Sequence, residues 1–216
     1  MERPRPRRRR PRSDGTATRS HILEVAGRLL AERGLAATTS RDICHAAGTN
    51  LAAINYHFSG RAGLYDAVLA AAHAQLVSLD DLEAIRRSGA SPRHQLRQLI
   101  GLLVGHLTGA DPPWGLQLLL RELTSPSARL PVLLRRAVLP KVRLMLGMLG
   151  ELLGVPEDHP AAQQALAFAI LPCVMMNIVP RTLLRRALPA LVGAPEQLAD
   201  ALTRYALAGM RTLRSR

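Results

Sequence analysis

The spacing of apolar residues predicts that this chain is almost entirely helical. In the first 80 residues, apolar positions recur every three or four residues in four separate runs, as on one face of an α-helix. Further helical runs follow, and no run has the alternation typical of a strand. The predicted helices span approximately 21–33, 40–48, 51–57, 61–76, 93–107, 114–123, 130–153, 161–179 and 195–213.

Polar residues and glycine stand where these helices should begin and end. Thr39 followed by Asp42 resembles a capping box, in which the first turn exchanges side-chain and backbone hydrogen bonds. Asn50 is a good N-cap for the next short helix. Gly48 supplies the glycine that a tight turn between two helices needs. Pro140 predicts a kink in the long helix that contains it.

Residues 39–58 together have the geometry of a helix-turn-helix. Small and apolar residues near the turn, including Cys44 and Ile54, can fill the angle between two short helices that cross closely. We interpret Cys44 as a small core residue and not as a reactive thiol. The second helix leaves small and polar side chains exposed, which suits entry into the major groove of DNA.

Positive charge is concentrated at the N-terminus. The chain has 29 Lys and Arg against 16 Asp and Glu, a net charge of +13. Residues 1–20 alone hold eight arginines and two carboxylates. Because residues 1–18 contain three prolines and almost no apolar side chain, they are predicted to form a disordered arm. The arm could lie on nucleic-acid phosphates, or it could be a solvated tail that adds only nonspecific charge.

Motifs of several other classes of protein are missing from the sequence. It has no Gly-rich phosphate loop, no Gly-x-Ser-x-Gly and no His-Glu-x-x-His, so we expect no enzyme activity. Cys44 and Cys173 are far apart and lack metal-ligand spacing, so we expect no disulfide, metal or cofactor. The uncharged run 160–180 is long enough to span a bilayer, but Pro172 and polar residues interrupt it. A buried core or interface helix is the better interpretation.

Four short motifs follow one another through the helix-turn-helix and the start of the next helix: Thr38-Thr39-x-Arg41-Asp42-Ile43, Ala47-Gly48, Asn55-Tyr56-His57-Phe58 and Arg61-x-x-Leu64-Tyr65. With these motifs, about residues 20–66 resemble the helix-turn-helix domain of the TetR family of bacterial transcriptional regulators. Cys44 stands where that family usually has alanine, and Arg61 where it usually has lysine. The stretch 121–127 and the helix that ends at 151–154 look like the C-terminal domain of the CecR type.

This resemblance implies a three-helix DNA-binding domain followed by a helical domain for ligand binding and dimerisation. The expected divisions are an arginine-rich arm over 1–18, a DNA-binding domain over 19–66 and a ligand-binding and dimerisation domain over 67–216. The family implies a cytoplasmic homodimer that binds a near-palindromic DNA operator, most often as a repressor released by a small-molecule effector. The alternative is a cationic helical protein that binds nucleic acid or membrane surfaces nonspecifically through its arm.

Candidate phosphate contacts lie at the two outer ends of the helix-turn-helix. Free N–H groups and the helix dipole favour a phosphate at the start of the first helix. Contacts beyond the second helix would hold the DNA backbone on the other side. Packing at the helix end is the alternative for the aromatic pair. The candidates are Thr39, Ser40 and Arg41 on one side, and Tyr56, His57 and Arg61 on the other.

Base contacts are expected from the second helix of the motif. Asn50 and Asn55 could each pair with adenine through two hydrogen bonds. Leu51 and Ala53 could touch thymine methyl groups. The exposed face of the motif carries no arginine to pair with guanine other than Arg41. The sequence therefore predicts adenine and thymine at the positions that are read directly.

The C-terminal half offers weaker candidates, each with an ordinary core position as the alternative. By resemblance, the last two long helices would form a four-helix bundle with those of a second copy. A ligand pocket is mostly apolar with a few polar anchors. The dimer candidates are Leu166, Ile170, Val174, Leu198, Leu202, Tyr205 and Met210. The ligand candidates are His106, Trp114, Glu122, Met145 and Met148, and the sequence leaves the effector unidentified.

Overall fold

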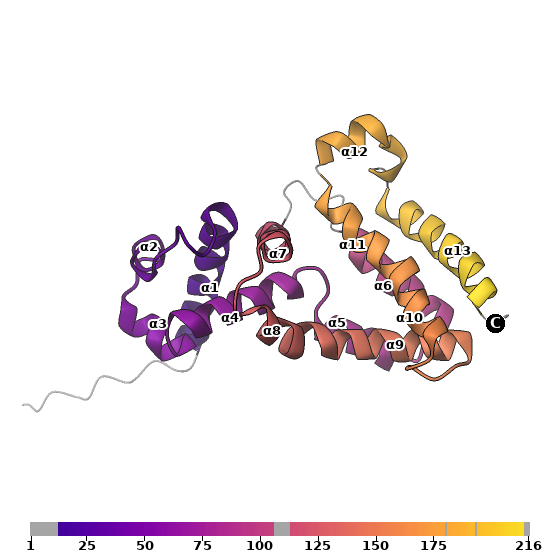
Figure 1. Ribbon diagram of the computed structural model, residues 1–216, viewed down its shortest axis with the longest axis horizontal. Coiled ribbons are helices and arrows are strands. Elements are labelled where there is room, and N and C mark those ends of the chain that lie inside the picture. Colours follow the sequence, from indigo (N-terminus) through magenta and orange to yellow (C-terminus); the bar gives the residue numbers. More distant parts are fainter. Residues whose placement is uncertain (1–12, 106–112, 180, 193, 214–216) are drawn as a thin grey trace, which may run out of the picture. The chain divides into compact units, whose positions relative to one another are not determined.

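The computed structural model describes residues 13–105, 113–179, 181–192 and 194–213, and every regular element in these ranges is a helix (Figure 1). The predicted all-helical fold class is therefore confirmed. The chain divides into two compact units, unit 1 (Met1–Val68) and unit 2 (Leu69–Arg216). The division falls inside the helix α4, Arg61–Ala74, which therefore contributes to both units.

Unit 1 contains α1 (Ser13–Arg33), α2 (Ser40–Ala46), α3 (Leu51–Phe58) and the start of α4. Helix α2 packs against both α1 and α3. Each helix contributes apolar side chains at helical spacing to one small core, as the sequence pattern predicts. The buried residues include Ile22, Ala26, Leu30, Ile43, Ile54, Phe58, Leu64, Tyr65 and Val68.

The first helix begins earlier than the sequence pattern indicates. Helix α1 starts at Ser13, so the prediction of a disordered arm is wrong for residues 13–18, and residues 1–12 lie outside the described ranges. The guanidinium of Arg19 lies 5.0 Å from the ring centroid of Phe58, which is a cation–π distance. Arg19 and Phe58 stand 39 positions apart in the sequence, so the composition of the N-terminal segment does not reveal this tertiary contact.

Unit 2 is built around α6 (Pro92–Gly105), which packs against α13, α9, α11 and α5. Its core includes Leu99, Leu103, Met148, Ile170 and Cys173. The run 160–180, predicted to be a core or interface helix, is partly core: Ile170 and Cys173 are buried, whereas Phe168, Leu171 and Met175 are exposed. The other elements of unit 2 are α5 (Leu79–Arg87), α7 (Trp114–Thr124), α8 (Leu130–Leu133), η2 (Leu134–Val138), α9 (Leu139–Leu153), α10 (Pro160–Ala165), η3 (Leu166–Ile170), α11 (Leu171–Ile178), α12 (Arg181–Ala187), η4 (Pro189–Leu191) and α13 (Pro195–Leu213).

Helix α5 was missed by the apolar pattern. It begins at Ser78, whose side chain accepts a hydrogen bond from the backbone of Asp81 while the Asp81 carboxylate accepts one from Ser78. This is the same capping box as that of Thr39 and Asp42. The Ser-x-x-Asp spacing was therefore a signal that could have located α5.

Two prolines are accommodated by wider turns instead of helix breaks. The π-helical turn Leu134–Val138 precedes Pro140, and Leu166–Ile170 precedes Pro172. Proline lacks an N–H group and its ring crowds the preceding turn, and a π turn gives the backbone room to continue. The predicted helix around Pro140 thus continues through the proline in a wider form.

By length and composition alone, one described stretch, Arg61–Arg87, could cross a membrane. Its apolar side chains are also those of core helices, since Leu64, Val68, Leu69 and Ala72 are buried within the protein. This stretch includes the turn between α4 and α5, so it is not one uninterrupted helix.

Candidate nucleic-acid interface

The N-terminus of α2 is closed by the predicted capping box. The Asp42 backbone N–H donates to Thr39 Oγ1 over 3.2 Å, and the Asp42 carboxylate accepts from the Thr39 hydroxyl over 2.6 Å and from the Thr39 N–H over 2.8 Å. The hydrogen bond from the Thr39 hydroxyl, and to a smaller extent that from the Thr39 N–H, hold the pKa of Asp42 below its usual value. The Thr39 hydroxyl is therefore used within the protein, while Arg41 beside it is exposed.

The turn between α2 and α3 matches its prediction. Gly48 has a φ of 58°, in the left-handed region that favours glycine. The Thr49 N–H donates to the carbonyl of Cys44 over 2.9 Å, which closes the end of α2. Asn50 then caps α3, because its side-chain oxygen accepts from the Ala53 N–H over 3.0 Å. The cap engages the Asn50 oxygen that a bidentate pair with adenine would also need.

Helix α3 has one buried face and one exposed face. Ile54 is fully buried and Phe58 nearly so, which anchors the helix to the unit 1 core. Among its other residues, Leu51 is 54% exposed, Tyr56 is 84% exposed, and Asn55 is also exposed. Such a surface, with an amide, a phenol and a leucine on one short helix, can reach the edges of base pairs and the sugar-phosphate backbone.

The aromatic residues at the end of α3 divide between two roles. The ring of His57 is half-buried and lies edge-on to Tyr56, with centroids 4.9 Å apart, and 6.2 Å from that of Phe58. Packing, the alternative for both residues, therefore describes His57 better than Tyr56. Ala53 is also half-buried, so it presents less surface than Leu51.

Arg61 makes contacts that the sequence did not predict. Its Nη2 donates to the carbonyls of Leu35 and Thr38, both over 2.8 Å. The expected phosphate contact is therefore replaced, for this nitrogen, by two hydrogen bonds within unit 1. Leu35 stands 26 positions before Arg61 in the sequence and Thr38 stands 23 positions before it, so no local pattern signals these bonds.

The ligand candidates in unit 2 lie in its core as far as they are described. Met145, Met148 and Glu122 are buried, and Trp114 is half-buried, whereas His106 lies outside the described residues. Glu122 accepts hydrogen bonds from the Ser127 N–H over 3.2 Å and from the Ser127 hydroxyl over 3.1 Å. This carboxylate therefore stabilises the turn that follows α7.

A buried cation in unit 2 also escaped the sequence analysis. Lys141, the only lysine of the chain, is 4% exposed. Its Nζ lies 2.8 Å from His73 Nδ1 and donates to the carbonyl of Val77 over 2.7 Å. Burial lowers the pKa of Lys141 to about 8. The pKa of His73 is lowered to about 4, chiefly by burial of its ring and to a smaller extent by the charge of Lys141.

The dimer candidates are mostly core residues, the alternative left open by the sequence. Two of the seven are buried in unit 2 and four are half-buried against its core, which leaves Tyr205, 78% exposed. The exposed apolar residues on the neighbouring segment are Phe168, Leu171 and Met175. Their spacing of three and four residues was a signal that the sequence analysis missed. The six core residues are Leu166, Ile170, Val174, Leu198, Leu202 and Met210.

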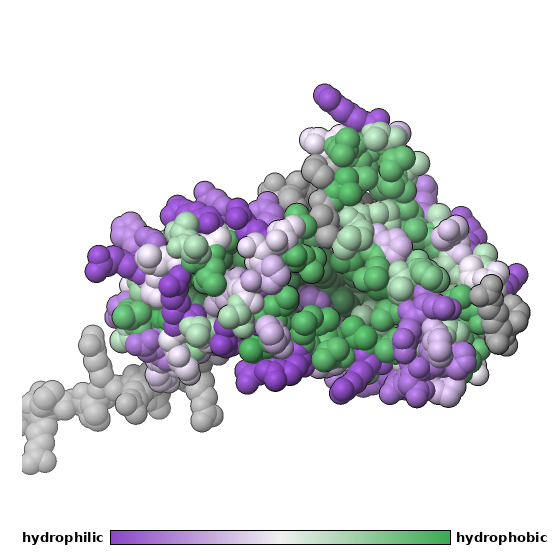
Figure 2. Space-filling model, viewed as in Figure 1, coloured by the Kyte–Doolittle hydropathy of each residue, from purple (hydrophilic) through white to green (hydrophobic). Residues whose placement is uncertain are grey.

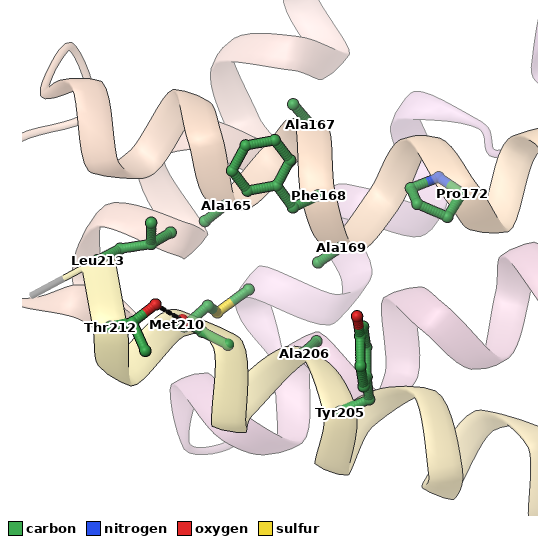
Figure 3. Close-up of a pocket in the computed structure, with 11 residues that line it drawn as sticks. Ala165, Ala167, Phe168, Ala169, Pro172, Tyr205, Ala206, Met210, Thr212 and Leu213 are labelled. Carbon is green, nitrogen blue, oxygen red and sulfur yellow. Dashed lines mark hydrogen bonds between the residues drawn. The ribbon is translucent and has the colours of Figure 1, made fainter.

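A groove of about 430 Å³ lies between the segment 165–172 and α13. Alanine and glycine form much of its lining, and Figure 3 shows Phe168 and Tyr205 at its sides on facing helices. Hydrophobic residues also gather over α11 and α12 in Figure 2. Among the described residues, this part of unit 2 therefore presents an apolar groove with two exposed aromatic rings beside it.

Comparison with protein families gives two matches along the chain. Residues 22–68 match the family described as "Bacterial regulatory proteins, tetR family". Residues 92–212 match the family described as "HTH-type transcriptional dual regulator CecR, C-terminal domain". The first match covers the helix-turn-helix, and the second covers more than half of the chain.

Curated relatives match over part of the chain. The regulator TtgR of Pseudomonas putida is 40% identical over 65 residues, 30% of this chain and 31% of its own. The repressor KstR2 of Rhodococcus jostii is 36% identical over 92 residues, 41% of this chain and 42% of its own. The chain thus spans less than half the length of these relatives.

Solved structures match over nearly the whole chain but at low identity. The superantigen PfiT has a TM-score of 0.67 at 18% identity, covering 89% of this chain and 97% of that one. A TetR-family regulator of Mesorhizobium loti has a TM-score of 0.62 at 18% identity, covering 92% and 98%. At this identity the likeness establishes the fold alone.

Proposed function

Because the chain belongs to the TetR family of bacterial transcriptional regulators and carries a C-terminal domain of the CecR type, we propose that it is a sequence-specific DNA-binding repressor. Its operator is near-palindromic, and a small-molecule effector bound by unit 2 releases the protein from DNA. It acts as a homodimer in the cytoplasm. The alignments with TtgR and KstR2 cover less than half of the length of each of these relatives.

The exposed face of α3 supports DNA recognition most directly. Ile54 and Phe58 fasten the helix, so that Leu51, Asn55 and Tyr56 face solvent from a rigid support. Asn55 is the strongest candidate to read adenine, because the Asn50 oxygen already caps the helix. Leu51 suits a thymine methyl group. Tyr56 and Arg41 are the candidates for phosphate contacts.

Nonspecific binding through the arginine arm is the competing function. The helix-turn-helix has capped helices and a well-formed turn, which favours sequence-specific binding, because an arm that acts by charge alone needs no such motif.

Dimerisation is best supported by the apolar surface of unit 2. In a homodimer with two-fold symmetry, the same patch meets its own copy, so an aromatic ring beside a groove can enter the partner's groove. Phe168 and Tyr205 flank such a groove. We expect Phe168→Glu to lower the mass in sedimentation to that of a monomer at micromolar concentration, whereas exposed Arg93→Gln leaves it unchanged. A monomeric wild-type protein would contradict the dimer.

The first test of the DNA-binding function is fluorescence anisotropy on the intergenic DNA upstream of the protein's own gene and on a scrambled duplex of equal length, over a salt series. Phosphate contacts weaken binding to both as salt rises, whereas base contacts leave a gap of about 10³-fold or more between them. Two coincident curves would reject this region as an operator. Loss of nearly all binding to both duplexes after deletion of residues 1–12 would favour the arm as the binding element, whereas a sequence-specific regulator keeps the gap and loses only affinity.

A thermal-shift screen over metabolites and antibiotics tests the effector. A compound that binds the folded protein raises the unfolding temperature. The same compound should then abolish the anisotropy signal on the operator but not on a duplex bound through phosphates alone. A compound that stabilises the protein without releasing DNA would not be the effector.

A further inference from the structure

The guanidinium of Arg61 joins the two ends of the helix-turn-helix. Arg61 is the first residue of α4, directly after the corner that follows α3. Its Nη2 donates to the carbonyls of Leu35 and Thr38, each over 2.8 Å, in the loop that leads into α2. The whole of α2, the turn and α3 therefore lies in the loop of chain that this side chain closes.

Both sides of this closure are themselves well anchored. Thr38 is almost fully buried, and its hydroxyl donates to the carbonyl of Gly34 over 2.8 Å. Thr39, the next residue, is the N-cap of α2. On the other side, Ser59 and Gly60 both have a positive φ, 58° and 96°, in the corner that delivers Arg61. The hydrogen bonds thus connect the residue before the N-cap of α2 to the first residue of α4.

The chemistry of this contact differs from that of a phosphate contact. A guanidinium NH₂ group has two N–H bonds, and the two carbonyls use both of those on Nη2. Backbone carbonyls carry partial negative charge, so the bonds are charge-assisted and hold the planar group in one orientation. Nη2 cannot donate to a phosphate while it holds these two carbonyls.

We propose that Arg61 is a positioning residue for DNA recognition: by tying the loop before α2 to the start of α4, it holds α2 and α3 in the orientation that lets α3 read bases. This inference rests on the proposed DNA-binding function and adds to it a residue that acts through the motif and not through a phosphate. Arg61 supports the shape of the motif, and Asn55 and Leu51 read the DNA.

The test compares Arg61→Gln, Arg61→Lys and Arg41→Gln, with Arg93→Gln in unit 2 as a control that removes one exposed positive charge elsewhere. Affinities for operator and scrambled DNA are measured over a salt series, well below the unfolding temperature. We expect Arg61→Gln to lower operator affinity about tenfold or more and scrambled-DNA affinity much less. The salt slope should stay that of the wild type in both Arg61 variants, with the affinity of Arg61→Lys between those of Gln and Arg.

A phosphate contact would produce the opposite result. Loss of one phosphate contact lowers the slope of log affinity against log salt by about 0.9 and weakens both duplexes alike. That pattern in Arg61→Gln, with full recovery in Arg61→Lys, would overturn the proposal. Arg41→Gln, which removes an exposed arginine on α2, supplies the comparison for a charge placed to meet a phosphate.

Hydrogen exchange of the free protein separates this inference from the proposed function. We expect Arg61→Gln to speed exchange of the Ala47 and Thr49 amides, which close α2, by about tenfold, while Arg93→Gln leaves them unchanged. Unchanged exchange in Arg61→Gln would overturn the positioning role. A wild type that does not distinguish operator from scrambled DNA would instead reject the proposed function, whatever the exchange shows.

Discussion

Two cations hold the ends of α4 in the two compact units, and their surroundings are opposite. At the start of α4, in unit 1, Arg61 donates to the carbonyls of Leu35 and Thr38 at the protein surface. At its end, in unit 2, Lys141 of α9 donates to the carbonyls of Val77 over 2.7 Å and His73 over 3.4 Å inside the core. Both sites thus pair one cation with two backbone carbonyls.

The difference shows that burial, and not the number of hydrogen bonds, sets the energetic consequence. Water can hydrate the exposed guanidinium of Arg61 when the contact breaks, so the expected loss of global stability is small. At the Lys141 site the ammonium has left water without a carboxylate as its hydrogen-bond partner, which lowers the pKa of Lys141 to about 8. The exposed Arg61 contact can therefore orient the helices of the motif with little effect on stability. The buried Lys141 contact makes the free energy of unfolding depend on pH.

The largest predicted effect sharpens this comparison at the buried end. Because the folded state binds the Lys141 proton less tightly than the unfolded chain does, stability should rise with pH from about 8 to 10.5, by roughly 3 kcal/mol. Urea unfolding at a series of pH values measures this rise. Lys141→Met should abolish it, and a rise that persists in the variant would assign it to another group.

His73 should add a second, smaller pH dependence in acid. Its pKa of about 4 in the folded protein lies below its ordinary 6.5, so the folded state disfavours its protonation. Stability should therefore fall as the pH drops from 6.5 to about 4, by roughly 2 kcal/mol after allowance for partial exposure. His73→Gln should flatten that window in the same unfolding series. Solvent-exposed His94→Gln serves as the control and should leave it intact.

At the other end of α4, Thr38→Val tests the anchor beneath the Arg61 contact. The substitution removes the hydroxyl that donates to the Gly34 carbonyl and keeps a side chain of similar shape. We expect a loss of about 1 kcal/mol of unfolding free energy, independent of pH between about 5 and 9. Thermal or urea unfolding measures it. An equal loss in Ser40→Ala, outside this anchor, would show that the effect is not specific to it.

The smallest effect on stability should belong to Arg61→Gln. Since the guanidinium is exposed, we expect a change of less than about 1 kcal/mol in unfolding free energy, together with the loss of operator affinity described above. Denaturant unfolding and anisotropy on the same preparation give both values. A stability loss as large as that of a core substitution would remove the contrast between the two ends of α4.

Much of the helix-turn-helix could be predicted because its determinants are local. The Thr39–Asp42 capping box, the left-handed Gly48 and the Asn50 cap each form within four residues, and all three occur as the sequence predicts. The hydrogen bonds that decide these features join neighbours, so residue type and spacing suffice. The same reasoning would have located α5 from its Ser78–Asp81 pair.

Tertiary contacts decided the rest. Phe168 and Ile170 are both apolar and stand two residues apart, yet one is 65% exposed and the other is buried, since only the packing of α6, α13 and the π turn selects the inward face. Arg61 bonds residues 23 and 26 positions away, and Lys141 bonds residues 64 and 68 positions away. The sequence alone determined the caps and the turn of the helix-turn-helix and the side chains that α3 can present to DNA. Only folding decided which apolar faces remain exposed and where the two cations bind, because those contacts join segments that no local pattern relates.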